Sequence, residues 1–219
     1  MSSASSVRDP YDALRPWSAI THGAGALAAV LGTVLLVLRA RSLTELVGFG
    51  VYGLSMILLY TASTLYHTLS TAPAGRRLLR KLDHCSICLL IAGSYTPICM
   101  LALWDGCGPA LLAAVWLFAL AGILLSLLWI TAPRWLSAGV YLCMGWLVVF
   151  AIVPVVRTLD PAALFWLVLG GVMYSVGGVL YAVKWPGRSN PRFGCHEIFH
   201  VFILLGSLFQ YFTIYRLIP

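Results

Sequence analysis

The stretch ALLAAVWLFALAGILLSLLWIT, residues 110–131, decides the fold class because it contains no charged side chain. About 20 consecutive apolar residues of α-helix cross the hydrocarbon core of a bilayer. Further apolar runs of similar length lie on both sides of this stretch, separated by turn-forming or charged residues. The predicted spans are 17–38, 46–70, 83–104, 110–131, 136–156, 162–183 and 195–215. We therefore predict an all-α, polytopic transmembrane bundle of seven helices.

The sequence pattern excludes a transmembrane β-barrel, because no segment alternates apolar and polar residues with a period of two. The composition agrees with a helical membrane protein. Hydrophobic residues make up 61% of the chain and charged residues 10%, and the mean hydropathy is +0.93. Soluble domains are about half apolar and about a quarter charged. At 219 residues, the chain has room for one compact bundle and no sizeable soluble domain.

Residues 1–16 are polar and rich in serine, and we expect them to form a flexible cytoplasmic tail. The transmembrane domain then occupies residues 17–219. The tail contains no apolar run followed by a small-residue cleavage site, so we expect no cleavable signal peptide. The first span itself is expected to direct insertion into the membrane.

The net charge of +7 comes from basic residues between the apolar runs. They indicate topology rather than a nucleic-acid-binding face, so no nucleic-acid partner is expected. The side of the N-terminal tail carries ten of them: Arg8, Arg15, Arg76, Arg77, Arg80, Lys81, Arg134, Lys184, Arg188 and Arg192. The opposite side carries Arg39, Arg41, Arg157 and Arg216. The positive-inside rule predicts a cytoplasmic N-terminus and an outside C-terminus in a multi-pass plasma membrane protein.

Cys85 and Cys88 form a C-x-x-C motif, but it lies in an apolar helical segment rather than a strand-helix-strand unit. We interpret these two of the six cysteines as helix-packing residues rather than a redox pair.

The segment His196-Glu197-Ile198-Phe199-His200 opens the last predicted span. Residues four apart face the same side of a helix, so both imidazoles can bind one metal ion. As a string the segment is H-E-x-x-H, the zincin signature, in which the glutamate is the general base. Two histidines that hydrogen-bond a neighbouring helix would show the same spacing. The cost of ionisable groups inside a membrane favours a functional role.

The predicted topology brings further polar residues to the same depth. Span two finishes on the inner side at His67, with Ser63 one turn deeper on the same face. Span three begins on the inner side at Asp83-His84, and span seven begins there at His196. Three imidazoles with an open coordination position are typical of a catalytic zinc site.

Asp83 is the candidate general base, holding the water that a zinc ion would acidify. A pairing with Arg80 or Lys81 at the membrane interface is the alternative role for this carboxylate.

Together, several motifs resemble the hemolysin III branch of the PAQR family (progestin and adipoQ receptors). They are Ser63-x-x-x-His67, Lys81-Leu82-Asp83-His84, Gly93-Ser94-Tyr95-Thr96-Pro97, Tyr174 with Tyr181, and His196-x-x-x-His200. The resemblance covers about residues 17–216. It implies seven spans, Zn²⁺ held by the three histidines, and Asp83 hydrogen-bonded to a zinc-bound water. Ser63 matches the family's serine before the first ligand.

The wider superfamily includes ceramidase-like amidases, which implies hydrolysis of an acyl amide or a related lipid. The leading hypothesis is therefore a zinc-dependent hydrolase that takes membrane lipids from the inner leaflet and contributes to lipid homeostasis. A receptor or sensor with structural zinc, a hemolysin-type cytolytic protein and an intramembrane protease are the alternatives. The lipid substrate and the oligomeric state stay open.

The sequence suggests less specific roles for four more residues near the predicted site. Glu197 is about 100° around the helix from His196, so we expect it beside the site or at the interface rather than as the base. His22 is expected to be a core or interfacial residue. Cys195 and His84 are the candidates for a fourth zinc ligand.

Overall fold

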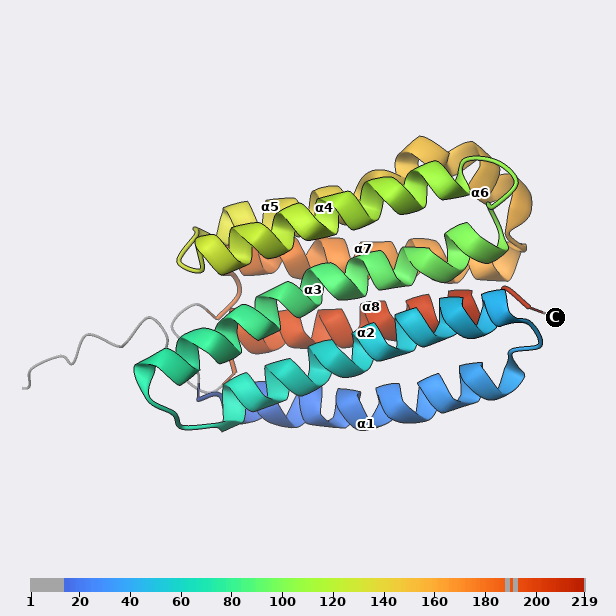
Figure 1. Ribbon diagram of the computed structural model, residues 1–219. Helices are drawn as coiled ribbons and strands as arrows, with labels where there is room; N and C mark the ends of the chain where they lie inside the picture. The colour runs from blue at the N-terminus through green and yellow to red at the C-terminus, as the bar shows by residue number, and fades with distance from the viewer. Residues whose placement is uncertain (1–13, 188–189, 191–192, 219) are drawn as a thin grey trace, which may run out of the picture.

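A computed structural model describes residues 14–187, 190 and 193–218 of the chain. Most of the predicted tail, together with Arg8, Arg188 and Arg192, lies outside the described residues. Within them the chain forms seven helical segments that are long and apolar enough to cross a membrane, which confirms the predicted fold class. The segments are α1 (Pro16–Arg39), α2 (Leu43–Thr68), α3 (Pro73–Leu101), α4 (Gly108–Leu128), Arg134–Thr158, α7 (Pro161–Val183) and α8 (Cys195–Tyr215) (Figure 1).

Local sequence explains where several helices begin. Pro16, Pro73 and Pro161 occupy the first turns of α1, α3 and α7, where a fixed φ and a missing N–H suit the helix. The Ser42 side chain accepts a hydrogen bond from the Glu45 N–H at 3.2 Å and caps α2. The Asp160 carboxylate caps α7 by accepting two backbone N–H groups, at 3.0 and 3.2 Å. These contacts satisfy donors that a helix leaves unpaired at its N-terminus.

The predicted start of the third span at Asp83 is wrong by ten residues, because α3 begins at Pro73. The four basic residues assigned to a loop therefore lie on the first turns of this helix: Arg76, Arg77, Arg80 and Lys81. Hydropathy marks where an apolar run begins, whereas arginine and lysine are good helix formers that can continue a helix into the interface. Asp83 thus lies well inside α3.

The fifth span is also different from the single helix predicted over residues 136–156. It consists of α5 (Arg134–Gly145), a 3₁₀ segment η1 (Trp146–Ala151) and α6 (Ile152–Thr158). The Tyr95 hydroxyl of α3 donates to the Gly145 carbonyl at 2.6 Å and accepts from the Val148 N–H at 3.0 Å. Irregular backbone is tolerated at membrane depth where protein groups satisfy it. The change from α-helix to 3₁₀ helix at η1 is therefore accompanied by hydrogen bonds from Tyr95 on another helix. The sequence of the fifth span alone does not predict this change.

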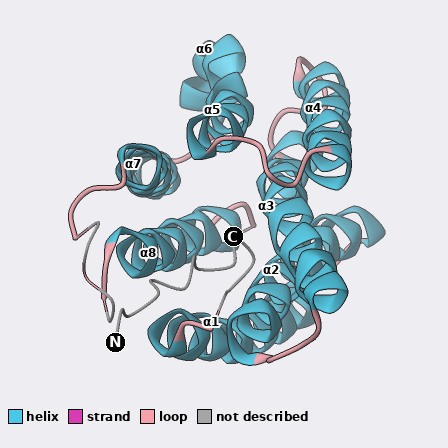
Figure 2. Cartoon of the chain, turned by 90° about the vertical axis from the view of Figure 1, so that its left-hand side faces the viewer, coloured by secondary structure: helices cyan, strands magenta, loops and turns pink. Residues whose placement is uncertain are grey.

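The helices that carry the candidate site are the most buried ones. More than half of the apolar windows of α2 and α3 is buried, whereas most of α1, α4 and the fifth span faces outward. In Figure 2, seen along the helices, α2 lies between α1 and α3, and α8 lies beside α7. The Tyr60 hydroxyl donates to Ser207 Oγ at 2.6 Å, and the Tyr52 hydroxyl donates to the Ser207 carbonyl at 3.1 Å. These bonds join α2 to α8.

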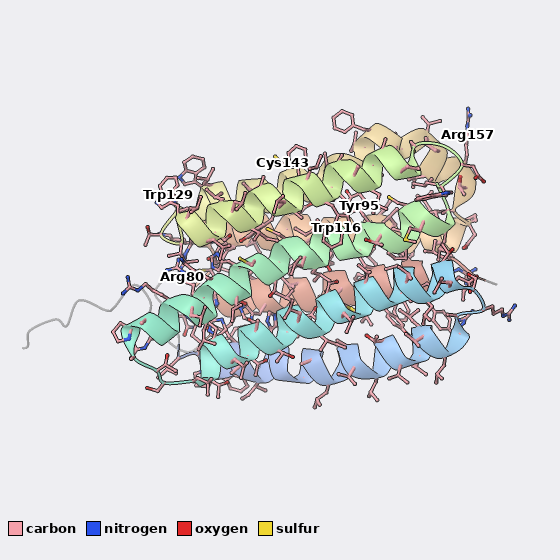
Figure 3. All side chains as sticks on the ribbon, in the orientation of Figure 1. Arg80, Tyr95, Trp116, Trp129, Cys143 and Arg157 are labelled. Atoms are coloured by element: carbon pink, nitrogen blue, oxygen red, sulfur yellow. The ribbon has the colours of Figure 1, made fainter. Side chains whose placement is uncertain are left out.

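The first and the last helix of the bundle place their outer ends at opposite ends of the molecule. Helix α1 begins at one end and α8 finishes at the other, as an odd number of spans requires (Figure 1). Arg80 and Arg157 lie at opposite ends in Figure 3. The order of the helices therefore separates these two basic residues along the length of the bundle.

Candidate metal centre

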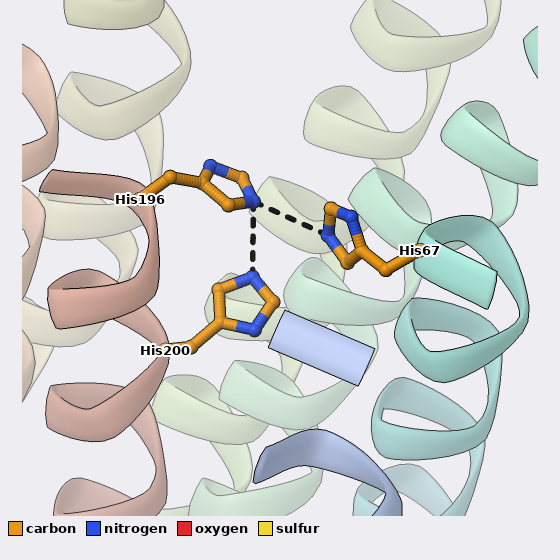
Figure 4. A group of neighbouring side chains, drawn as sticks. All are labelled: His67, His196 and His200. Carbon is orange, nitrogen blue, oxygen red and sulfur yellow. Dashed lines mark hydrogen bonds between the residues drawn. The ribbon is translucent and has the colours of Figure 1, made fainter. Parts of the chain in front are cut away.

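Three imidazoles meet at the end of the bundle where α2 finishes and α8 begins. His67 lies in the last turn of α2, and His196 and His200 lie one turn apart at the start of α8. Their rings point toward one another (Figure 4). Each offers one nitrogen, and these three atoms lie within 4.8 Å of one another. His67 and His200 are buried and His196 is partly buried, so the structure brings together the three predicted ligands.

The two nitrogen–nitrogen distances from His196 fit metal ligands better than a pair of hydrogen bonds. His196 Nε2 lies 3.2 Å from His67 Nε2 and 3.1 Å from His200 Nε2. A ring nitrogen carries either one proton or one lone pair, so this atom cannot make two full hydrogen bonds in these directions. Zinc–nitrogen bonds of about 2.0–2.1 Å in a tetrahedron place the nitrogens roughly 3.3 Å apart. The three residues can therefore hold a metal ion.

A cavity of about 300 Å³ extends from this cluster into the bundle. Ser63 and Asp83 line it together with His196 and His200, and both are buried. The Ser63 hydroxyl and the Asp83 carboxylate are interacting neighbours in this cavity. Along α8 the cavity wall continues to Gln210, about 15 Å from His200 at the rise of an α-helix. The wall between these points is mostly apolar, so the cavity suits a hydrocarbon chain.

Glu197 points away from the three nitrogens into a separate ion pair. Its Oε1 accepts from Arg15 Nη1 at 2.8 Å and from Ser18 Oγ at 3.3 Å, and its Oε2 accepts from the Gly194 N–H at 2.9 Å. The Arg15 backbone N–H donates to the His67 carbonyl at 3.2 Å. Arg15 thus connects the ends of both histidine-bearing helices. Sequence reasoning missed this role, because Arg15 and Ser18 carry no motif and Arg15 was interpreted only as a topology signal.

His22 of α1 packs directly against the cluster. Its ring stacks on His200 with centroids 3.7 Å apart, and it makes an edge-type contact with Tyr60, whose ring centroid lies 5.0 Å away. The His22 side chain is buried, with 3% of its surface exposed. The sequence left this residue without a role, and the structure makes it a wall of the His200 site.

Neither candidate for a fourth ligand joins the cluster. Among residues 14–187, 190 and 193–218, no nitrogen, sulfur or carboxylate oxygen of His84, Cys195 or Asp83 completes a group with the three histidines. His84 and Asp83 instead line the cavity. The cluster therefore offers three protein ligands on the side of the cavity.

The sequence profile of the family described as "Haemolysin-III related" matches residues 15–211, a range that contains every residue of this site. The chain belongs to this family. It is 38% identical over 200 residues to the protein named Hemolysin-3 homolog of Bacillus subtilis (strain 168), covering 90% of this chain and 91% of that protein. It is 36% identical over 201 residues to Hemolysin-3 of Bacillus cereus, covering 90% and 88%.

A more distant relative confirms the wider PAQR relationship expected from the motifs. The chain is 30% identical over 216 residues to the Adiponectin receptor protein of Drosophila melanogaster, covering 87% of this chain and 48% of that receptor. No solved structure matches the chain.

Proposed function

We propose that this haemolysin-III-related protein is a zinc-dependent hydrolase that acts on acyl lipids of its own membrane. The observation that carries the proposal is the position of the three imidazoles at one end of an apolar cavity inside the bundle. A structural zinc site is closed by four protein ligands, whereas a catalytic site keeps a position open. Three converging histidines without a fourth ligand among the described residues favour the catalytic form.

The residues around the cluster have the chemistry that acyl hydrolysis needs. Zinc, when bound, supplies a Lewis acid that polarises a carbonyl and acidifies water. Asp83 lines the cavity beside the histidines and is the acceptor for the proton of the attacking water. The Ser63 hydroxyl lines the same cavity beside Asp83 and can donate a hydrogen bond to the substrate carbonyl. His67, His196 and His200 are the proposed zinc ligands, and Asp83 and Ser63 the proposed catalytic residues.

Substrate can reach this cavity from the lipid. Val149 of η1, Ile152 of α6 and Val168 of α7 line the cavity and are also 47%, 43% and 56% exposed on the outside of the bundle. Residues that face both the cavity and the bilayer mark a lateral opening between the fifth span and α7. An acyl chain can therefore pass from the membrane into the cavity without crossing water.

The proposed membrane topology follows from the distribution of basic residues along the chain. We place residues 1–16 and the histidine end of the bundle in the cytoplasm, the C-terminus outside, and residues 17–219 in the plasma membrane as one domain. At this depth the enzyme acts on inner-leaflet lipids and contributes to membrane lipid homeostasis.

Metal content tests the first half of the proposal. Protein purified in detergent should contain about one zinc per chain by elemental analysis, and His67→Ala and His200→Ala should lose most of it. His84→Ala is the matched control, because His84 lines the cavity but stays outside the nitrogen cluster. Wild-type protein without a divalent ion, or equal loss in the control, would refute the zinc site.

Measurements of lipid hydrolysis test the proposed enzymatic activity and distinguish the role of Asp83 from that of Glu197. Asp83→Asn should keep zinc but reduce hydrolysis of an N-acyl sphingosine by about 100-fold or more, the usual effect of losing a general base. At saturating zinc, Glu197→Gln should reduce it by about tenfold or less, because Glu197 pairs with Arg15 and does not line the apolar cavity. The reverse ranking would identify Glu197 as a zincin-like base. Zinc without turnover of any acyl lipid would favour the receptor or sensor with structural zinc.

A further inference from the structure

A second, polar cavity of about 200 Å³ lies at the same end of the bundle as the histidines. Among the described residues its lining includes Arg15, Arg134, Lys184 and Glu197. His196 lines this cavity as well as the long apolar one. The two cavities therefore meet at a proposed zinc ligand, one suited to hydrocarbon and the other to charge.

The charges in the polar cavity do not cancel. Glu197 is already bound by Arg15 and by the Gly194 N–H. Arg134 and Lys184 have no carboxylate partner among the described residues. Among the described lining residues, one carboxylate against three cations leaves an excess of two positive charges, the amount that a phosphate group would balance.

Arg134 and Lys184 come from different helices but converge on the same point. Arg134 is the first residue of α5, and its guanidinium lies 4.9 Å over the ring of Tyr181. Tyr181 also contacts the site, with its ring centroid 5.8 Å from that of His196. Lys184 ends α7 three residues later, in a left-handed conformation with φ of 58°. Figure 2 looks onto this end, where α7 is a neighbour of both α5 and α8.

Glycine is the usual residue where a helix ends in the left-handed region, because a Cβ is disfavoured there. The chain nevertheless carries a lysine at this position. Its backbone N–H donates to the Leu180 and Tyr181 carbonyls, so the turn holds the lysine beside the polar cavity.

We propose that Arg134 and Lys184 bind the phosphate group of the substrate, which is therefore an acyl lipid with a phosphorylated headgroup. This inference rests on the proposed hydrolase function. A lipid with its acyl chain in the apolar cavity has its carbonyl at the histidines and its headgroup in the polar cavity. With a neutral headgroup, neither cation would gain an anionic partner among the described residues. Charge-assisted hydrogen bonds from arginine or lysine to phosphate are the strong contacts that such a site provides.

Two substrates that differ only in the phosphate test the proposal. They are an N-acyl sphingosine and the same lipid phosphorylated at its 1-hydroxyl, compared in mixed micelles with full-length, zinc-loaded protein. Wild-type kcat/KM should be about tenfold or more higher for the phosphorylated lipid. Arg134→Gln/Lys184→Gln should lose this preference while hydrolysis of the neutral lipid changes little. Lys81→Gln is the control, because Lys81 lies at the same end of the bundle but outside the cavity.

Equal rates on both lipids in the wild type, or a preference that survives in the double variant, would overturn the proposal. A preference lost equally in Lys81→Gln would indicate general attraction of anionic lipid to a basic surface and would also overturn it.

Binding measurements separate this inference from the hydrolase proposal. The shift in unfolding temperature is measured with the phosphorylated lipid, the neutral lipid and inorganic phosphate. If neither lipid is hydrolysed but the phosphorylated one stabilises only protein that retains Arg134 and Lys184, the hydrolase proposal fails and the phosphate site stands. If inorganic phosphate stabilises the protein as strongly as the lipid, the site binds the free ion and the substrate assignment fails.

Discussion

Replacing Glu197 by glutamine tests how the N-terminal segment holds the two histidine-bearing helices together. The substitution keeps the shape of the side chain but removes its charge and one of its two acceptor oxygens. In the structure these oxygens accept from Arg15, Ser18 and the Gly194 N–H. The variant therefore loses the ion pair and retains part of the hydrogen bonding.

The burial of the two partners sets the size of the effect. Breaking a fully buried ion pair from one side costs about 3–5 kcal/mol. The Glu197 side chain is 2% exposed, but Arg15 is 23% exposed and can be partly solvated by water. We therefore expect a loss of about 2 kcal/mol in the free energy of unfolding. For a chain of this length this lowers Tm by about 4–8 °C.

The chain contains a matched control for this substitution. Glu45 holds the third position of α2, as Glu197 does in α8, and accepts a hydrogen bond from the Arg41 N–H. That bond is exposed to solvent, so Glu45→Gln removes a helix-end charge without a buried ion pair. Its expected cost is about 0.5 kcal/mol. Both variants are compared by thermal unfolding in the same detergent.

A second measurement tests the connection to the metal site. Arg15 donates its backbone N–H to the His67 carbonyl, so loosening its side chain should disturb both His67 and His196. Zinc affinity, measured by competition with a chelator, should fall by about 10- to 100-fold in Glu197→Gln. Equal Tm shifts for the Glu45 and Glu197 variants, or an unchanged zinc affinity, would refute the reasoning.

Two further predictions concern the packing and the orientation of the bundle. Gly206→Ala would bring a Cβ to 2.6 Å from the ring of Tyr174, whose hydroxyl bonds Ser207, so we expect a loss of about 1–3 kcal/mol. Gly50→Ala is its control and should not destabilise, because no atom lies within 4 Å of the added carbon; thermal unfolding measures both. Tags at the two chain ends should label from opposite sides of the membrane, with the N-terminal tag cytoplasmic, and labelling from one side would contradict the topology.

The bounds of the helices show which features local sequence can predict. Residues 110–131 predict a span because length and hydropathy belong to the segment alone, and α4 occupies Gly108–Leu128. The same reasoning misplaced the start of α3, because an interfacial helical extension with arginine and lysine has the composition of a loop. It also missed η1, because the hydroxyl that bonds this backbone belongs to Tyr95 on another helix.

Within the site, sequence alone determined that His196 and His200 share one helix face, since a spacing of four residues is a property of the α-helix itself. Together with the hydropathy pattern and the count of basic residues, it also predicted that His67 would lie at the same depth. Only the tertiary structure decided that His67 Nε2 lies 3.2 Å from His196 Nε2, and that Glu197 pairs with Arg15, 182 residues away in the chain. The two cavities that meet at His196 likewise exist only in the folded bundle. These features depend on how helices rotate and tilt against one another, and that packing is set by contacts among residues far apart in sequence.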